Sequence, residues 1–254
     1  MRRVAGAVLA LGVLAGPAAG QTDYYNTDEG RPVRIEDAAA VERYAFEIQL
    51  APLRLDLQGG SYIWEVAPEL AYGILPRTQV EVAFPFAFLD GGHQGLAGIE
   101  VSALHNLNTE TRTLPALAVA GSVHLPVGPL ASDDAYASVK GIATRTFSWA
   151  RFHANAEYTF GPDAGEEGKW MAGLAVDRAF PLRSLLVTAD VFAEEPWADD
   201  VDLLWTAETG IRYQLSPQFN VDAGVGRRFA GAQGWFFTVG AAHAFALRSL
   251  LPGR

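Results

Sequence analysis

The feature that most constrains this chain is the alternation of polar and apolar residues over long stretches. In RFHANAEYTF, residues 151–160, polar residues occupy one side of an extended chain, and Phe152, Tyr158 and Phe160 occupy the other. Successive side chains of a strand point to opposite faces, so the pattern predicts an amphipathic strand. VEVAFPFAF at 80–88 and QFNVDAGVGRRF at 218–229 alternate in the same way. Because a soluble sandwich and a membrane barrel both alternate, strand length and connections must decide between them.

The predicted strands are long. The pattern from Tyr44 onward indicates about twelve strands, most of about twelve residues. Strands of soluble domains usually have about five or six residues, whereas a tilted membrane-spanning strand needs about nine to eleven. Length therefore favours a transmembrane barrel. The strands are expected at residues 44–57, 61–74, 78–89, 96–107, 112–126, 136–147, 149–160, 169–180, 183–194, 202–215, 218–229 and 234–246.

The connections between these strands alternate between long and short. LQGGS, DGGHQG and PVGPLASDDA are long, and LPRT, NTET and FSW are short. Outer-membrane barrels have short periplasmic turns and long extracellular loops, so the fold class is an all-β, transmembrane, antiparallel up-and-down β-barrel. Pro68, Pro85 and Pro115 fall inside predicted strands, where each removes a ladder donor. The apolar side of the first strand also switches near Pro52, which indicates either a bulge or a wrong boundary.

Composition and the ends of the sequence complete the predicted organisation. Residues 1–20 have two arginines, an apolar run and small residues at the end, which is typical of a cleaved signal peptide. The chain has no cysteine and a formal net charge of −10, so disulfides are excluded and nucleic acid is not an expected partner. Export places the protein in the cell outer membrane. Residues 44–246 form the barrel, 247–254 a tail, and 21–43 a periplasmic lead-in, a lumen plug or a docking segment.

Three blocks carry a family resemblance. GRPVRIEDAAAVERYAFEIQLAP, LAYGILPRTQVEVAFPF, and TGIRYQLSPQFNVDAGVGRRF followed by WFFTVGAAHAF resemble the outer-membrane barrel family catalogued as a putative MetA-pathway of phenol degradation, whose members are often labelled transporters. The resemblance implies a barrel that passes small molecules, including aromatic or hydrophobic compounds. In the last block, Thr238, Gly240 and Phe245 fit the closing-strand pattern that barrel-insertion machinery recognises. Outer-membrane lipid and this machinery are the expected partners.

The alternation also assigns side chains to the lumen and to the lipid. Acids outnumber bases on the polar face, which indicates a filter for cations or neutral solutes; the alternative is an ion-pair network that fills the lumen. Aromatic residues near strand ends are expected to form an interfacial girdle. The lumen candidates are Glu65, Glu69, Glu81, Glu100, Lys140, Arg151, His153, Asn155, Glu157, Asp190, Glu208, Arg212, Asp222 and Arg228; the girdle candidates are Trp64, Tyr72, Trp170, Trp205, Trp235 and Phe245.

The functional expectation is a passive pore or small-solute transporter without a cofactor, a metal or covalent chemistry. The alternative is a closed structural or surface-interaction barrel. An outer-membrane lipid hydrolase comes third, because Ser122 and His124 reverse the order that such enzymes place on one strand. The stretch GVG at 224–226 has the Gly-x-Gly pattern but lacks a third glycine and begins no helix, so it does not predict a dinucleotide site.

Overall fold

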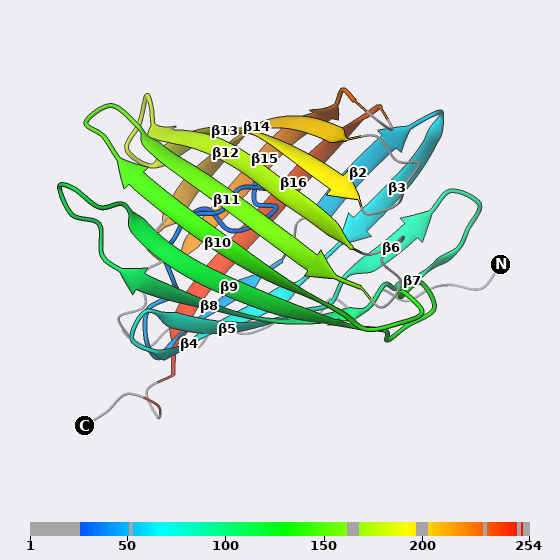
Figure 1. Ribbon diagram of the computed structural model, residues 1–254, viewed down its shortest axis with the longest axis horizontal. Coiled ribbons are helices and arrows are strands. Elements are labelled where there is room, and N and C mark those ends of the chain that lie inside the picture. Colours follow the sequence, from blue (N-terminus) through cyan, green and yellow to red (C-terminus); the bar gives the residue numbers. More distant parts are fainter. Residues whose placement is uncertain are drawn as a thin grey trace.

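The protein folds as one antiparallel sheet that closes on itself. The computed structural model describes residues 26–50, 53–161, 168–196, 203–230, 233–247 and 250; the expected signal peptide and almost all of the expected tail lie outside this part. Neighbouring strands in the sequence are neighbours in the sheet, and the last strand pairs with the first, as Figure 1 shows. The all-β barrel architecture is therefore confirmed. No helix in the described residues is long and apolar enough to cross a bilayer.

Sixteen strand segments build twelve strands, because the first four strands are each split in two. The later strands, β8 to β16, have 10 to 13 residues, which is the length a tilted membrane-spanning strand needs. The segments are β1 (Ala45–Gln49), β2 (Leu53–Gln58), β3 (Ser61–Val66), β4 (Glu69–Leu75), β5 (Thr78–Ala83), β6 (Phe86–Leu89), β7 (Gln94–Leu96), β8 (Ile99–Asn108), β9 (Ala116–Leu125), β10 (Tyr136–Thr146), β11 (Arg151–Phe160), β12 (Lys169–Ala179), β13 (Leu185–Pro196), β14 (Leu204–Ser216), β15 (Phe219–Arg228) and β16 (Gly234–Ala246).

The split of the first strand is a register shift. Gln49 pairs with Ala242 and Leu53 pairs with Val239, so an advance of four residues (53 − 49) on one strand faces an advance of three (242 − 239) on the other. An extra residue reverses the side of the sheet to which the following side chains point. The parity switch predicted near Pro52 thus matches a one-residue register shift between β1 and β2, and Pro52 itself lies outside the described residues.

The next two splits follow from proline. Pro68 lies between β3 and β4, and Pro85 lies between β5 and β6. Neither has an N–H to donate, but each carbonyl still accepts a hydrogen bond from the neighbouring strand, from Phe84 N at 3.0 Å and from Ala97 N at 2.7 Å. The strands therefore stay in contact across the splits at the cost of one ladder donor each.

Two expectations about the connections are wrong. Residues 59–60, expected as a long loop, form a two-residue turn in which both glycines have positive φ, 59° and 90°. The connection at NTET, expected to be short, spans residues 109–115, so Pro115 lies outside the strands and β9 begins at Ala116. Glycines with positive φ favour a two-residue hairpin turn, and proline favours a place just before a strand. The predicted alternation of long and short connections did not take these backbone preferences into account.

The barrel is polar inside and apolar outside. His153, Asn155 and Glu157 are 2%, 3% and 7% exposed, whereas Phe160 on the opposite face of β11 is 50% exposed. Leu174 in the middle of β12 is 63% exposed. A water-soluble sandwich would bury the apolar face and expose the polar one, so the inversion fits a barrel whose outer face meets hydrocarbon.

The lipid-facing assignment predicts a large stability difference between two leucines that are both exposed. Leu174→Arg at mid-strand should destabilise the folded protein by about 2–4 kcal/mol, because a charge at the bilayer midplane loses its hydration. Leu182→Arg, in the turn after β12, should change the free energy of unfolding little, since that turn is expected outside the hydrocarbon. Equilibrium urea unfolding in lipid vesicles measures both. Equal tolerance of arginine at the two positions would contradict the assignment.

Candidate functional site

The lumen-facing residues of the strands form the candidate site. All fourteen lumen candidates lie on the inner side of the barrel, but they fall into two groups. Glu65, Glu69, Glu81 and Glu100 line a cavity together with Lys140 and Glu157. The others contact the wall or the segment of chain that precedes β1; they are Arg151, His153, Asn155, Asp190, Glu208, Arg212, Asp222 and Arg228.

The six girdle candidates lie on the outer face near the strand ends. Trp64, Trp170, Trp205 and Trp235 are 38–53% exposed and lie toward the end of the barrel at which β2 ends and β12, β14 and β16 begin, here called the loop end. Toward the opposite end, the turn end, Tyr72 and Phe245 stack on either side of Phe46 with ring centroids 4.4 and 5.4 Å apart. Aromatic side chains thus border both ends of the apolar outer surface, where headgroups favour their rings.

The segment that precedes β1 runs through the lumen. Residues 26–43, here called the lumen segment, lie inside the ring of strands, drawn in blue in Figure 1. They form no strand, so their backbone N–H groups need side-chain partners. Wall residues supply them: Arg34 N donates to Glu208 at 2.6 Å, and Ile35 N donates to Asp190 at 3.0 Å. Acids on the wall therefore serve as acceptors for an irregular chain.

A buried arginine fixes the start of this segment. Arg31 is fully buried and donates to Asp222 at 2.6 Å and to Asn220 at 3.0 Å, both on β15. Its own carbonyl accepts a bond from Arg212 of β14 at 2.6 Å. Removing one partner of a buried pair leaves an uncompensated charge, which costs about 3–5 kcal/mol. The pair therefore holds the segment firmly to β14 and β15.

Glycines of the wall make room for the same contact. A Cβ at Gly210 would lie 2.6 Å from Pro32 Cγ, and a Cβ at Gly224 would lie 2.6 Å from the carbonyl oxygen of Pro32. Both distances are shorter than real Cβ contacts allow, so only glycine lets the segment approach this closely. The GVG stretch at 224–226 thus serves packing inside the lumen.

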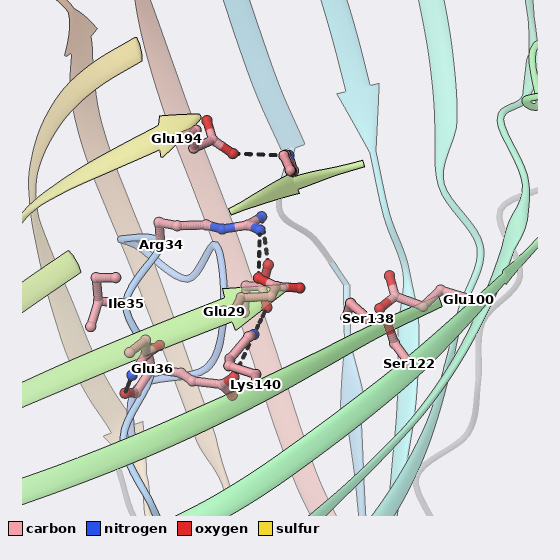
Figure 2. A network of polar contacts seen from close by, with 12 residues as sticks. Glu29, Arg34, Ile35, Glu36, Glu100, Ser122, Ser138, Lys140 and Glu194 are labelled. Atoms are coloured by element: carbon pink, nitrogen blue, oxygen red, sulfur yellow. Dashed lines mark hydrogen bonds and ion pairs between the residues drawn. The ribbon is translucent and has the colours of Figure 1, made fainter. Parts of the chain in front are cut away.

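A second network joins the segment to β10. Lys140 is buried and lies between Glu29 and Glu36, as Figure 2 shows. Glu36 Oε1 is 2.7 Å from Lys140 Nζ. Arg34 forms ion pairs with two glutamates: its Nη1 lies 2.5 Å from Glu29 Oε1, and its Nη2 lies 3.3 Å from Glu157 Oε2 on β11. The opposite charges compensate one another, which permits ionisable groups in a space that is partly shielded from water.

A third network surrounds a buried histidine. His153 lies between Thr144 at 3.0 Å and Asp177 at 2.9 Å, and Arg151 donates to the same Asp177 at 2.7 Å. Thr144 in turn accepts a bond from Ala38 N of the lumen segment at 3.0 Å. A histidine whose two ring nitrogens are both engaged and fully enclosed orients its neighbours and has no free face for substrate.

The lumen segment leaves a cavity of about 460 Å³ on the loop-end side. Glu65, Glu69 and Glu81 face it and form no ion pair among the described residues, whereas Glu100 lies 3.4 Å from His124. Apolar and aromatic surface is also present, including Tyr136, whose ring stacks on His124 with centroids 4.2 Å apart. The volume is in the range of pockets that hold small molecules, and its wall carries excess negative charge.

A smaller cavity of about 210 Å³ lies on the turn-end side of the segment. Its walls come from residues 39–42, from one end of the closing pair (Ala45 and Glu47 of β1, Ala244 of β16), and from the polar side chains of Gln79, Arg212 and Asn220. The lumen is therefore divided into two chambers by its own chain.

The hydrolase candidates are not assembled for catalysis. Ser122 and His124 both face the larger cavity from β9, but Ser122 shares a hydrogen bond with Ser138 at 2.9 Å, while His124 lies 3.4 Å from Glu100 and stacks on Tyr136. A serine nucleophile needs its base within hydrogen-bond reach. Within the described ranges, no group of three or more His, Cys, Asp or Glu side chains is arranged to hold a metal ion.

Comparison with known proteins relates the fold to outer-membrane channels. A KdgM porin matches with a TM-score of 0.55 and 11% identity over 78% of this chain and 99% of its own. The COG4313 outer membrane channel from Pseudomonas putida F1 matches with a TM-score of 0.58 and 13% identity over 86% and 100%. The NanC porin gives 0.56 and 7% over 78% and 98%. The chain has the fold of the outer-membrane porins.

The other two comparisons give no relative. No family model matches the chain, and no curated protein matches it. The resemblance to the phenol-degradation barrel family therefore stays a prediction. At 7–13% identity the matched structures establish the architecture, and the content of the lumen has to be interpreted from this chain's own residues.

The sequence did not identify the residues of the lumen segment that make these contacts. Arg31, Arg34 and Glu36 lie in a stretch without strand periodicity, so no face could be assigned to them. One available signal was the density of charged residues in GRPVRIEDAAAVER. A lead-in exposed to solvent would not need acids that pair with the basic residues of the lumen. The missing information was spatial: which wall residues lie opposite each charge.

The docked segment should respond to pH through Glu36. Burial first, and then the neighbouring Glu29, raise the pKa of Glu36 to about 7 against the lowering effect of Lys140; burial raises the pKa of Asp37 as well. Because the docked state favours the protonated form of Glu36, docking is fully stabilised at pH values below the ordinary pKa of 4.5. This stabilisation is lost as the pH rises through about 7 and Glu36 ionises. Arg34 and Lys140 outweigh burial and lower the pKa of Glu29 to about 2, so Glu29 stays ionised in this window.

A nitroxide on Ala39→Cys, in a chain that has no other cysteine, reports the mobility of the segment. Its spectrum should show a more mobile label at pH 8 than at pH 5, and Glu36→Gln should remove most of the difference. A label whose mobility increases toward pH 5 instead would contradict the sign of the effect.

Proposed function

We propose that the protein is an outer-membrane pore through which small solutes diffuse, and that the lumen segment restricts their passage. The observation that carries the proposal is the polar lumen: a closed barrel with an apolar outer face encloses a charged cavity of about 460 Å³. A barrel that served only as a membrane scaffold would need no solvated space of this size. Diffusion needs no covalent step and no cofactor.

The charge of the larger cavity favours neutral or cationic solutes. Its lining has eight Asp or Glu side chains and four Lys or Arg side chains, and Glu65, Glu69 and Glu81 have no ion-pair partner in the described residues. An acidic wall disfavours anions at short range. The KdgM porin has been crystallised with oligogalacturonate, which is a polyanion. Despite the common fold, a polyanion is a poor ligand for this wall.

The shape and surface of the cavity favour small solutes with an apolar body. Alanines, Pro85, Leu104 and the ring of Tyr136 lie beside the carboxylates. Together with the resemblance to the phenol-degradation barrel family, this mixture supports aromatic or other hydrophobic compounds of small size as the transported class. Such a solute would place its apolar body on the alanines and its polar group among the carboxylates.

The route to the membrane belongs to the same proposal. Residues 1–20 would direct export, and the closing strand β16 would be recognised by barrel-insertion machinery through Thr238, Gly240 and Phe245. On β16, Thr238 is buried in the lumen while Phe237 and Val239 beside it are 46% and 56% exposed, which supports the alternation that such recognition requires.

A closed structural barrel is the second candidate. The observation that favours it is the density of buried ion pairs between the lumen segment and the wall, including Arg31 with Asp222 and Lys140 with Glu36. If these pairs never open, the segment is a permanent filling of the lumen.

Single-channel recording of the purified protein in planar bilayers separates the two candidates. The pore predicts discrete current steps with a cation preference, because the cavity wall is acidic. Replacing Glu65, Glu69 and Glu81 together by Gln should shift the reversal potential in a salt gradient toward zero. Glu110→Gln is the matched control, since Glu110 lies in the turn after β8 and pairs with Arg145 outside the lumen. Silence from folded protein at all voltages would favour the structural barrel.

A further inference from the structure

The two chambers of the lumen meet at a narrow boundary. The cavity of about 460 Å³ and the cavity of about 210 Å³ have only three lining residues in common, Asp28, Ala39 and Gln79. Asp28 and Ala39 belong to the lumen segment, and Gln79 is the wall residue that faces them from β5. The two chambers are therefore nearest to each other at these three residues.

Gln79 closes the boundary through its side chain. It is 6% exposed, its Oε1 accepts a hydrogen bond from Val41 N at 2.5 Å, and its Nε2 donates to Glu81 Oε1. One end of the amide thus holds the lumen segment, while the other is fixed on the wall of the larger chamber.

The lumen segment is held very unevenly along its length. Residues 26–38, here called the anchored part, carry the buried ion pairs of Arg31, Arg34 and Glu36, and end at Ala38, which packs among Leu104, Ala118 and Ile142. Residues 39–43, here called the gate part, include the exposed Ala39, Glu42 and Arg43. Among the described residues, the one hydrogen bond from a wall side chain to the gate part is the bond of Val41 to Gln79.

The end of the gate part is a strained joint. Tyr44, the residue before β1, has φ of 70°, which is uncommon for a residue with a side chain. Its N–H donates to the Gly73 carbonyl at 2.7 Å, and a Cβ at Gly73 would lie 2.7 Å from the carbonyl oxygen of Val41 and collide with Glu42. Gly73 therefore allows the gate part to lie against β4.

We infer that Gln79 is the gate residue of the pore: release of Val41 from Gln79 lets residues 39–43 move and joins the two chambers, while the anchored part stays docked. The inference rests on the proposed pore function. Movement of residues 39–43 requires only the loss of neutral hydrogen bonds near exposed residues. Displacement of the whole lumen segment would separate several buried charges at once. The segments of a fold that open are those with few buried polar contacts. Among the described residues no ion pair holds residues 39–43; they contact the wall through the Val41–Gln79 bond, the packing of Ala40 on the cluster around Leu104, and a bridge between Arg43 and Gly73.

Three full-length variants test the gate in planar bilayers. Gln79→Ala should raise the ratio of open to closed time about fivefold, the shift expected from losing one neutral hydrogen bond. Gly73→Ala should act in the same direction by pushing Val41 and Glu42 off the wall. Gln49→Ala is the matched control, because Gln49 is a buried lumen glutamine that lines neither chamber and bonds to Glu47; its ratio should equal that of the wild type.

A thiol variant tests the same boundary independently of these substitutions. Ala39 is exposed, so Ala39→Cys should fold normally, and its reaction with a bulky thiol reagent should block the current because Ala39 lines both chambers. Ala38→Cys, buried at 2%, should not react. Heat-modifiable electrophoretic mobility verifies that each variant is folded.

The outcomes separate the gate from the pore. Longer open times in Gln79→Ala or Gly73→Ala than in the wild type, together with block at Ala39→Cys, support the gate. If the wild type is silent, current steps that appear in Gln79→Ala or Gly73→Ala support it in the same way. Current steps in the wild type that these substitutions and the thiol reagent leave unchanged would overturn the gate and leave the pore intact. Opening by Asp222→Asn without opening by Gln79→Ala would show that the segment moves as a whole. Silence of the wild type and of every folded variant would reject the pore itself.

Discussion

The pairing of β16 with β1 and β2 is the interaction on which the rest of the structure depends. In hydrocarbon an unpaired backbone N–H or C=O costs several kcal/mol, so a sheet can face lipid only if its two edges meet. The edges do meet here, but in two registers that differ by one residue, with the bulge between Gln49 and Leu53 absorbing the difference. The bulge keeps Ile48 and Leu53 both facing lipid, although their separation of five positions would place them on opposite sides of a regular strand.

Closure also explains why the lumen is charged and filled. Once the apolar residues face outward, every second residue of each strand has to face inward, where twelve strands enclose more space than their own side chains occupy. The acids and bases in this space are stable because they are paired with a segment of the same chain. Arg31 with Asp222 and Lys140 with Glu36 compensate charges that would otherwise be desolvated alone. The lumen segment therefore contributes to the stability of the wall as well as restricting the path through it.

The sequence predicted the architecture well and the site incompletely. Strand positions followed from period two, and the predicted 136–147 became Tyr136–Thr146, because alternation between lipid and lumen is imposed on every membrane strand. Loop lengths were less predictable, as at Gly59–Gly60, since a loop has no comparable constraint. The side of each wall residue, such as Glu208, could be assigned, but its partner could not: Glu208 accepts a backbone N–H from Arg34, 174 positions away. Contacts of an aperiodic segment depend on its path, and no local pattern encodes that path.

The uneven attachment of the lumen segment connects stability with function. If buried ion pairs held the whole lumen segment, the fold would be stable but the pore would stay closed. If no ion pair held the segment, the acids of the wall would be left unpaired. This chain separates the two requirements along its length: among the described residues, the ion pairs of the lumen segment end before Ala39, and Ala39 and Ala40, which follow, have no polar side-chain group that could bond to the wall. The strained backbone at Tyr44 lies where the gate part meets β1, so a movement there can relieve strain without disturbing the closing pair β1 and β16. The residues that must stay and the residues that can move are thus set by composition, with Gln79 at the boundary between them.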